Sequence, residues 1–368
     1  METAKTNRFQ VIDALRGTAS FGVCFAHLTY HIFGPHSLIK LIGGWGTYGV
    51  QIFFVISGFI IPYTLWKASY RLRNYGTFIL KRLIRLDPPY LLVVVFLIPL
   101  GYLSAHAPGY NGPPFHVTVP QVLLHVGYLN VFFGNNWLNG VFWTLAIEFQ
   151  YYLLVGIMFP LISTNSFGKR ALMFVFLALL AIAIPIHTFI FQWLFIFMLG
   201  MLVFQYFAAL ISLSVFFVWL GFLGTAAGLT LSPSIAIVAV MTALTIAFAK
   251  FSNAPLNFLG KISYSLYLIH EPVGRRVINL GERFATNSGE KYVILLAGLA
   301  SAMGAAWLLY WFVERPAQRW SSAITFNKRK PEAALSLPDK SGTEATGATV
   351  VLPGSPAPGL EVQSNSRL

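Results

Sequence analysis

Long apolar segments recur along almost the whole chain, and they constrain the fold more than any other feature. A helix needs about 20 mainly apolar residues to cross the hydrocarbon core of a bilayer. Ten segments approach that length, at residues 10–30, 45–66, 77–104, 140–162, 170–186, 188–207, 211–230, 234–251, 258–278 and 292–318. Only 10% of the residues are charged, whereas about 25% is usual in soluble domains. We therefore predict an all-α fold, a polytopic transmembrane bundle of about ten helices.

The last part of the chain has a different composition. Residues 326–368 are rich in Pro, Gly, Ser, Thr and Ala. Such a segment contains too few apolar side chains to offset the entropy lost on ordering. We expect one membrane domain at residues 1–325 and a disordered cytoplasmic tail at residues 326–368. Any chemistry then takes place inside the membrane domain.

The basic residues predict the orientation of the chain. The net charge is +13, but the basic residues lie at the ends of apolar segments, so we expect no nucleic acid partner. With a cytoplasmic N-terminus, the inner side would hold Lys5, Arg8, Lys67, Arg71, Arg73, Lys81, Arg82, Arg85, Lys169, Arg170, Lys250, Lys261 and the residues from Arg315 onward. The outer side would hold only Lys40, Arg275, Arg276, Arg283 and Lys291. This asymmetry predicts that both termini are cytoplasmic.

Ionisable side chains interrupt the first apolar segment. The stretch "IDALRGTASFGVCFAHLTYH" (residues 12–31) carries Asp13, Arg16 and His27. Arg16 and His27 are eleven residues apart, so on a helix they lie within about 20° of one another and some 16 Å apart along the axis. Because neither side chain is stable against lipid, a shared face predicts a shared cavity. The alternative is that Arg16 reaches the headgroups and His27 bonds a neighbouring helix. We expect Asp13 to cap or neutralise the start of the helix.

The fourth segment contains a single acidic residue. Glu148 lies in "NGVFWTLAIEFQYYLL", at a predicted depth similar to that of His27. An unpaired carboxylate at that depth is costly, and a histidine is a suitable partner. We therefore expect Glu148 to pair with His27.

A basic cluster marks the start of the third segment. Lys81, Arg82 and Arg85 occur in "FILKRLIRLDPPYLL", and Arg82 and Arg85 share a helix face. Paired guanidinium groups suit a ligand that carries phosphate. Ordinary anchoring of the helix end at the cytoplasmic surface is the alternative.

The loop at residues 105–139 contains no Lys or Arg. It combines aromatic and amide side chains, namely Tyr110, Phe115, Tyr128, Phe132, Phe133 and Trp137 with Asn111, Asn130, Asn135, Asn136 and Asn139. These groups suit sugar recognition, and an aromatic belt at the membrane interface is the equally weighted alternative.

Six short motifs follow one another along the chain. They are the Arg16 and His27 spacing, "FFVISGF", "KRLIRLDPPY", "FWTLAIEFQYYL", "LGKISYSLYLIHEPV" and "FVERPAQRW". Together they resemble the acyltransferase 3 family of integral membrane acyltransferases, which includes O-antigen and Nod-factor O-acetylases. The resemblance covers residues 10–320. It implies transfer of an acyl group, usually acetyl from acetyl-CoA, to a hydroxyl that commonly belongs to a sugar.

The resemblance also assigns roles to residues. It implies a catalytic group of His27, Glu148 and Arg16, and an acyl-CoA site at Arg82 and Arg85 together with Lys81 and Ser57. Neutral imidazole takes a hydroxyl proton near pH 7, so His27 is the expected base, and Glu148 would set its tautomer or stabilise the imidazolium. The role of His270 stays open between function and a helix–helix hydrogen bond.

The sequence thus predicts an O-acyltransferase of the bacterial inner membrane. Its expected partners are acyl-CoA as co-substrate, a saccharide or glycolipid acceptor, and membrane lipid, with no permanently bound cofactor and no metal. A single cysteine, Cys24, already excludes a cysteine zinc cluster and an intramolecular disulfide. The alternative is a transporter or flippase of a lipid-linked glycan or small anion, which buried ionisable groups would also serve. The sequence has no visible inverted repeat, and this disfavours a transporter.

Overall fold

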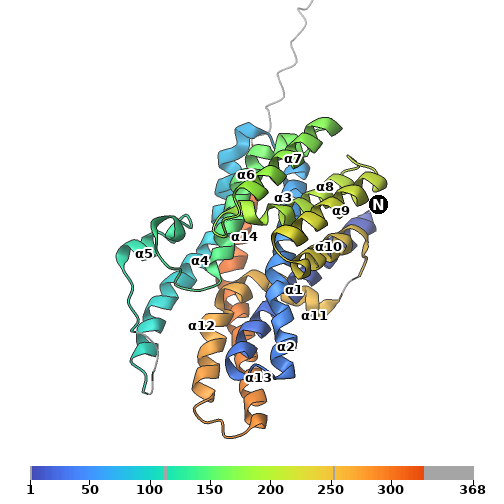
Figure 1. Ribbon diagram of the computed structural model, residues 1–368. Coiled ribbons are helices and arrows are strands. Elements are labelled where there is room, and N and C mark those ends of the chain that lie inside the picture. The colour runs from blue at the N-terminus through green and yellow to red at the C-terminus, as the bar shows by residue number, and fades with distance from the viewer. Residues whose placement is uncertain (1, 109, 111–113, 252, 327–368) are drawn as a thin grey trace, which may run out of the picture. The chain divides into compact units, whose positions relative to one another are not determined.

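The structure is a computed structural model that describes residues 2–108, 110, 114–251 and 253–326. Within these residues the regular elements are helices (Figure 1). They are α1 (Glu2–Ile32), α2 (Leu38–Gly44), α3 (Gly49–Lys67), α4 (Tyr75–Ala105), α5 (Val119–Leu123), α6 (Phe142–Ile162), α7 (Phe167–Ala183), α8 (Leu194–Phe207), α9 (Leu213–Thr230), α10 (Pro233–Phe248), α11 (Ala254–Lys261), α12 (Ser263–Gly281), α13 (Ser288–Leu309) and α14 (Arg315–Ala323). Short 3₁₀ turns include η1 (Trp45–Tyr48) and η4 (Ile190–Trp193), and a π-helical turn, η5 (Tyr310–Glu314), joins α13 to α14. The all-α prediction is confirmed.

The predicted apolar segments coincide with these helices. Six helical stretches are long and apolar enough to cross a membrane, namely Leu38–Lys67, Leu72–Ala105, Phe142–Ile162, Ile190–Phe207, Leu213–Thr230 and Ser288–Ala323. The helix α10 is apolar but shorter. The chain is therefore a helical membrane protein. Apart from Phe326, the predicted cytoplasmic tail lies outside the described residues.

Capping residues separate the closely spaced helices between residues 160 and 260. The hydroxyl of Ser212 accepts a hydrogen bond from the Val215 amide at 3.3 Å at the start of α9, and Ser232 does the same for Ile235 at 3.2 Å at the start of α10. Asn253 begins α11 in the same way. Such side chains satisfy amides that have no partner inside the helix. These caps mark where each new helix begins within a long apolar stretch that hydropathy alone divides poorly.

A close crossing of α3 and α8 builds the apolar core beside the site. The helix α8 is buried from Leu194 to Gln205, as expected for a helix that is apolar all round. Glycines face each other where it meets α3: a methyl group on Gly58 would overlap the carbonyl oxygen of Phe197, and one on Gly200 would overlap that of Val55. Small residues allow helix backbones to approach in this way. The crossing fixes α3, which carries Ser57 one residue away.

A second close crossing fixes α1. A methyl group on Gly17 would overlap the carbonyl oxygen of Leu256, and one on Gly260 would overlap that of Asp13. The backbone of α1 therefore lies directly against α11, and α12 begins beside it (Figure 1). This contact brings the first turn of α12 to the middle of α1. Arg16 and Ser263 meet there, with Arg16 Nε donating to Ser263 Oγ at 3.2 Å.

Candidate active site

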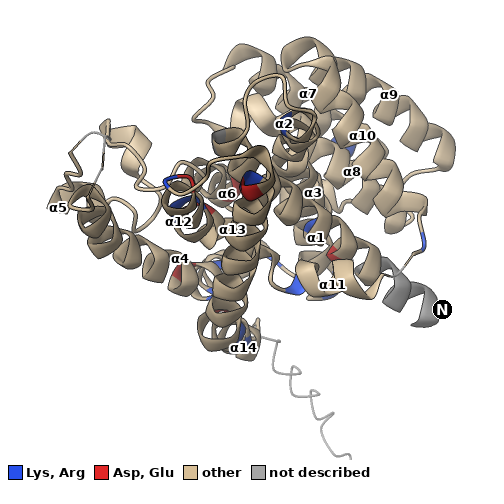
Figure 2. Cartoon of the chain, turned by 90° about the horizontal axis from the view of Figure 1, so that it is seen from below, with Lys and Arg blue, Asp and Glu red and all other residues tan. Residues whose placement is uncertain are grey.

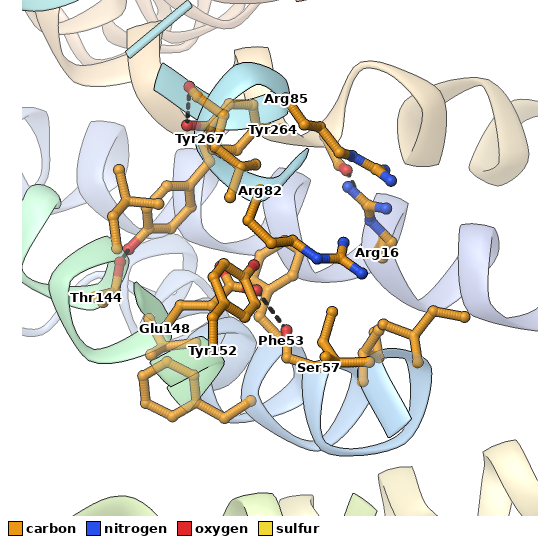
Figure 3. A pocket seen from close by; sticks show the side chains of 18 of the residues that line it. Arg16, Phe53, Ser57, Arg82, Arg85, Thr144, Glu148, Tyr152, Tyr264 and Tyr267 are labelled. Carbon is orange, nitrogen blue, oxygen red and sulfur yellow. Dashed lines mark hydrogen bonds between the residues drawn. The ribbon is translucent and has the colours of Figure 1, made fainter. Parts of the chain in front are cut away.

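Six elements enclose a polar cavity, which we call the arginine pocket. Its volume is about 130 Å³, several times the roughly 10–15 Å³ that one water molecule needs on the same measure. Its polar and aromatic lining consists of Arg16 from α1, Phe53, Phe54, Ser57 and Thr64 from α3, Arg82 and Arg85 from α4, Thr144, Glu148 and Tyr152 from α6, Ser263, Tyr264 and Tyr267 from α12, and Glu314 from η5. Five residues that the sequence predicts to be functional, Arg16, Ser57, Arg82, Arg85 and Glu148, therefore line one cavity (Figure 3).

Three arginine side chains dominate the charge of this pocket. The guanidinium groups of Arg16, Arg82 and Arg85 gather on one side of it (Figure 3). Arg82 Nη2 donates to the Thr64 hydroxyl at 3.1 Å, and its head lies 5.5 Å from the centre of the Tyr152 ring. Among the described residues, the one ion pair within 4.0 Å joins Glu271 and Arg275, outside the pocket. Three guanidinium groups without a contacting carboxylate favour an anionic ligand.

Two carboxylates partly balance these arginines. Ser57 Oγ donates to Glu148 Oε1 at 2.5 Å (Figure 3), and Tyr152, one turn further along α6, lines the same cavity. The predicted pair between Glu148 and His27 is wrong, because each makes its hydrogen bond to another residue. The rotation of α6 directs Glu148 toward α3, so it belongs to the pocket rather than to the histidine.

Glu314 is the second carboxylate, and the sequence argument assigned it no role. Its Oε2 accepts hydrogen bonds from the Ser265 hydroxyl at 2.6 Å and the Ser265 amide at 3.2 Å, and its Oε1 accepts one from Gln318 at 2.8 Å. It interacts electrostatically with Arg16 and Arg85. The π-helical turn at its position is a feature that often occurs at functional sites. An acidic residue inside the last apolar segment, within the motif "FVERPAQRW", was the signal that could have identified it.

A pair of histidines lies beyond one end of the pocket. His27 Nδ1 is 3.0 Å from His270 Nε2, and His270 Nδ1 is 3.0 Å from the carbonyl oxygen of Leu266. His270 is completely buried, whereas His27 is partly exposed. His27 therefore has a histidine as its partner, on the helix that begins beside Arg16.

Tyr267 connects the pocket with the histidine pair. It lines the pocket, and its ring centre is 6.0 Å from that of His270. Its hydroxyl is 2.7 Å from the Thr144 hydroxyl, and its ring packs edge-on against Phe53 (Figure 3). These contacts hold the ring between the arginine end of the site and His27. The shared face of Arg16 and His27 along α1 thus runs from the pocket to the histidines.

Two predicted polar residues lie outside this arrangement. Lys81 donates to the carbonyl oxygens of Ser321, at 2.8 Å, and Ile324, so it binds the end of α14 rather than the pocket. Asp13 was expected at a helix start, and this is wrong because α1 begins eleven residues earlier, at Glu2. Its carboxylate instead interacts electrostatically with Arg16 and Lys261.

The aromatic side chains of the segment after α4 divide into two groups. Tyr128 is buried, stacks on Tyr90 with 4.9 Å between ring centres, and donates to Asp87 at 2.9 Å. Phe132 and Phe133 are exposed. Tyr128, Phe132 and Trp137 also line a second cavity, of about 290 Å³, against the α6 residues Trp143 and Gln150. Aromatic faces beside amide groups are available there, on a face of α6 other than the one that lines the arginine pocket.

Comparison with known proteins identifies a family and several relatives of this chain. A family model described as an acyltransferase domain (acyltransferase 3) matches residues 9–311. The O-acetyltransferase OatA of Staphylococcus aureus strain NCTC 8325 is 26% identical over 416 aligned positions, covering 93% of this chain and 61% of OatA. OatA of strain MRSA252 is 25% identical over the same extent. ORF330 of Acidianus two-tailed virus is 31% identical over 179 residues, 48% of each chain. The chain thus spans about half to three-fifths of the length of these relatives. No solved structure matches it detectably.

Proposed function

This chain belongs to the acyltransferase 3 family, and from that premise we propose that it transfers an acyl group, acetyl first of all, from acyl-CoA to a hydroxyl of a saccharide or glycolipid. The observation that carries the proposal is the arrangement of three arginines around one cavity whose lining residue Tyr267 packs beside His270, one member of the histidine pair. Family membership also favours an enzyme over the transporter alternative.

The donor would bind with its phosphates at the arginine end. Arg82 and Arg85 lie within the first turns of α4, and guanidinium groups form the strongest hydrogen bonds with phosphate. The long pantetheine arm of coenzyme A would then extend past Tyr267 and bring the thioester to His27. Glu148 and Glu314 limit the positive charge of the empty pocket, so that the arginines can be buried before the donor arrives.

The reaction needs one base and one leaving group. His27 takes the proton of the acceptor hydroxyl while its oxygen attacks the thioester carbonyl. The carbon–sulfur bond then breaks, and the coenzyme A thiolate receives the proton from the His27 imidazolium. The net change is an ester and free coenzyme A, with no oxidant or metal required.

The two substrates would reach the site from opposite faces of the membrane. Coenzyme A is cytoplasmic, and the basic residues predict that the arginine end faces the cytoplasm. His27 lies eleven residues further along α1, a distance of about 16 Å. The acceptor would approach from the outer side, in the inner membrane of a bacterium. The segment between α4 and α6, with its aromatic and amide groups, is the proposed contact for a sugar.

Sealed proteoliposomes of defined orientation test the function and its sidedness together. Radiolabelled acetyl-CoA is supplied at the face that carries the N-terminus, and non-permeant oligosaccharides at the other face. We expect alkali-labile, ester-linked label on the saccharide, at a rate that depends on both additions. A purified protein that transfers no label to any hydroxyl acceptor contradicts the proposal. Transfer only when both substrates share the N-terminal face would refute the sidedness but keep the enzyme.

A further inference from the structure

We propose that His270 is a positioning residue, which holds His27 in the tautomer whose Nε2 carries a free lone pair. The proposal rests on the function proposed above, because it assigns the protonation state of the base in that reaction. It follows from two hydrogen bonds and from the difference in burial between the two imidazoles.

The first hydrogen bond determines the tautomer of His270. Its Nδ1 lies 3.0 Å from the carbonyl oxygen of Leu266, one turn earlier on α12. A carbonyl oxygen only accepts, so Nδ1 of His270 must carry the hydrogen. In a neutral imidazole the other nitrogen is then an acceptor. His270 Nε2 therefore presents a lone pair.

The second hydrogen bond passes this constraint to His27. His270 Nε2 is 3.0 Å from His27 Nδ1, and because His270 accepts, His27 Nδ1 must donate. A neutral His27 then has no hydrogen on Nε2. Within the described residues, no hydrogen bond is formed at that Nε2. The backbone carbonyl of Leu266 thus orients two imidazoles in series and leaves a basic nitrogen on the second.

Burial assigns different tasks to the two rings. His270 is completely buried and His27 is partly exposed, so a substrate reaches only His27. When His27 accepts a proton at Nε2, its Nδ1–H strengthens the bond to His270, because charged donors form stronger hydrogen bonds. The proton stays on His27, since a charge on the fully buried ring lacks solvation. Glu271 and Arg275, one and two turns along α12 from Tyr267, are the other charges that act on His27.

Two substitutions at His270 separate the two hydrogen bonds. Asparagine places its amide near the ring Nδ1, so His270→Asn keeps the contact to Leu266 but does not reach His27. Glutamine places its amide near the ring Nε2, so His270→Gln offers an oxygen to His27 Nδ1. We expect kcat to fall on the order of 10²-fold in His270→Asn, with the KM for acetyl-CoA changed less than about threefold. His270→Gln should retain at least about tenfold more activity than the asparagine variant. Equal activity of the two variants, or more activity in His270→Asn than in His270→Gln, would overturn the proposal.

A spectroscopic measurement tests the tautomer without any activity. Nitrogen NMR of ¹⁵N-histidine-labelled protein in lipid distinguishes the two neutral tautomers, and loss of a signal in His27→Ala assigns His27. We expect wild-type His27 to be protonated at Nδ1, and His270→Asn to lose this preference. Wild-type His27 protonated at Nε2 would refute the proposal even in an active enzyme. If the wild type shows the expected tautomer but transfers no acyl group, the proposed function fails and the assigned tautomer holds.

Discussion

The two parts of the membrane domain differ in how many charged residues they contain. From α7 to α10, residues 167–248, the chain contains only two charged residues, Lys169 and Arg170, and these ribbons are almost entirely tan in Figure 2. The elements α1, α4, α6 and η5 instead place three arginines and two glutamates around one cavity. The second part therefore contains the candidate site, and we call the first part the scaffold.

One arginine from each part, the buried Arg170 and the half-buried Arg82, shows what the difference means. Arg170 donates from one terminal nitrogen to the backbone carbonyl of Thr164 and from the other to that of Leu210, the latter at 2.7 Å. It thereby joins the segment before α7 to the segment before α9. Arg82 donates to a side-chain hydroxyl, that of Thr64, and its head lines a cavity. Residue type and burial alone do not identify a ligand-binding arginine. Its hydrogen-bond partners do.

The largest effect is expected at His27. His27→Ala removes the proposed base, so acyl transfer should fall by about 10³-fold or more. Donor binding should persist, because the phosphates contact the arginine pocket about 16 Å away. Activity is measured in proteoliposomes and binding by calorimetry with acetyl-CoA. A His27→Ala variant that keeps most of its activity would show that His27 is not the base.

The matched arginines provide the next test. Arg82→Gln removes a proposed phosphate ligand and should raise the KM for acetyl-CoA about tenfold or more, since a hydrogen bond to a charged group contributes about 1.5–3 kcal/mol. Arg170→Gln removes a similar guanidinium from the scaffold. It should lower thermal stability and leave that KM unchanged. Equal effects of the two variants on the KM for acetyl-CoA would contradict the proposal that Arg82 binds the donor and Arg170 does not.

The smallest effect is expected at two glycines, Gly58 on α3 and Gly221 on α9, and it concerns stability. Gly58→Ala forces α3 away from α8, because the added methyl group meets the Phe197 carbonyl, and should destabilise the protein by about 1–3 kcal/mol. Gly221→Ala, on α9, meets no atom within 4 Å and should cost nothing, since alanine favours a helix. Thermal melting in detergent compares them. Equal melting temperatures would show that the α3–α8 contact does not set stability.

The sequence predicts the helices well because crossing a bilayer imposes a length and a composition that can be read directly. It also singles out Arg16, Ser57, Arg82, Arg85 and Glu148, but divides them between a catalytic group and an acyl-CoA site, whereas the structure places all five around one pocket. Its errors concern rotation and local geometry. The partner of Glu148 depends on how α6 turns against α3. The placement of Glu314 depends on a π-helical turn, and the contact of Lys81 depends on where α14 ends. None of these leaves a periodic pattern in the sequence.

The central claim is that one site joins the arginine pocket to the histidine pair. The most direct test is a cryo-electron microscopy structure of the protein in nanodiscs with a non-hydrolysable thioether analogue of acetyl-CoA. The account predicts phosphate density against Arg82 and Arg85, an arm that passes Tyr267, and an acyl end in contact with His27 Nε2. Donor density away from the three arginines, or an acyl end that remains on the pocket side of Tyr267, would contradict it.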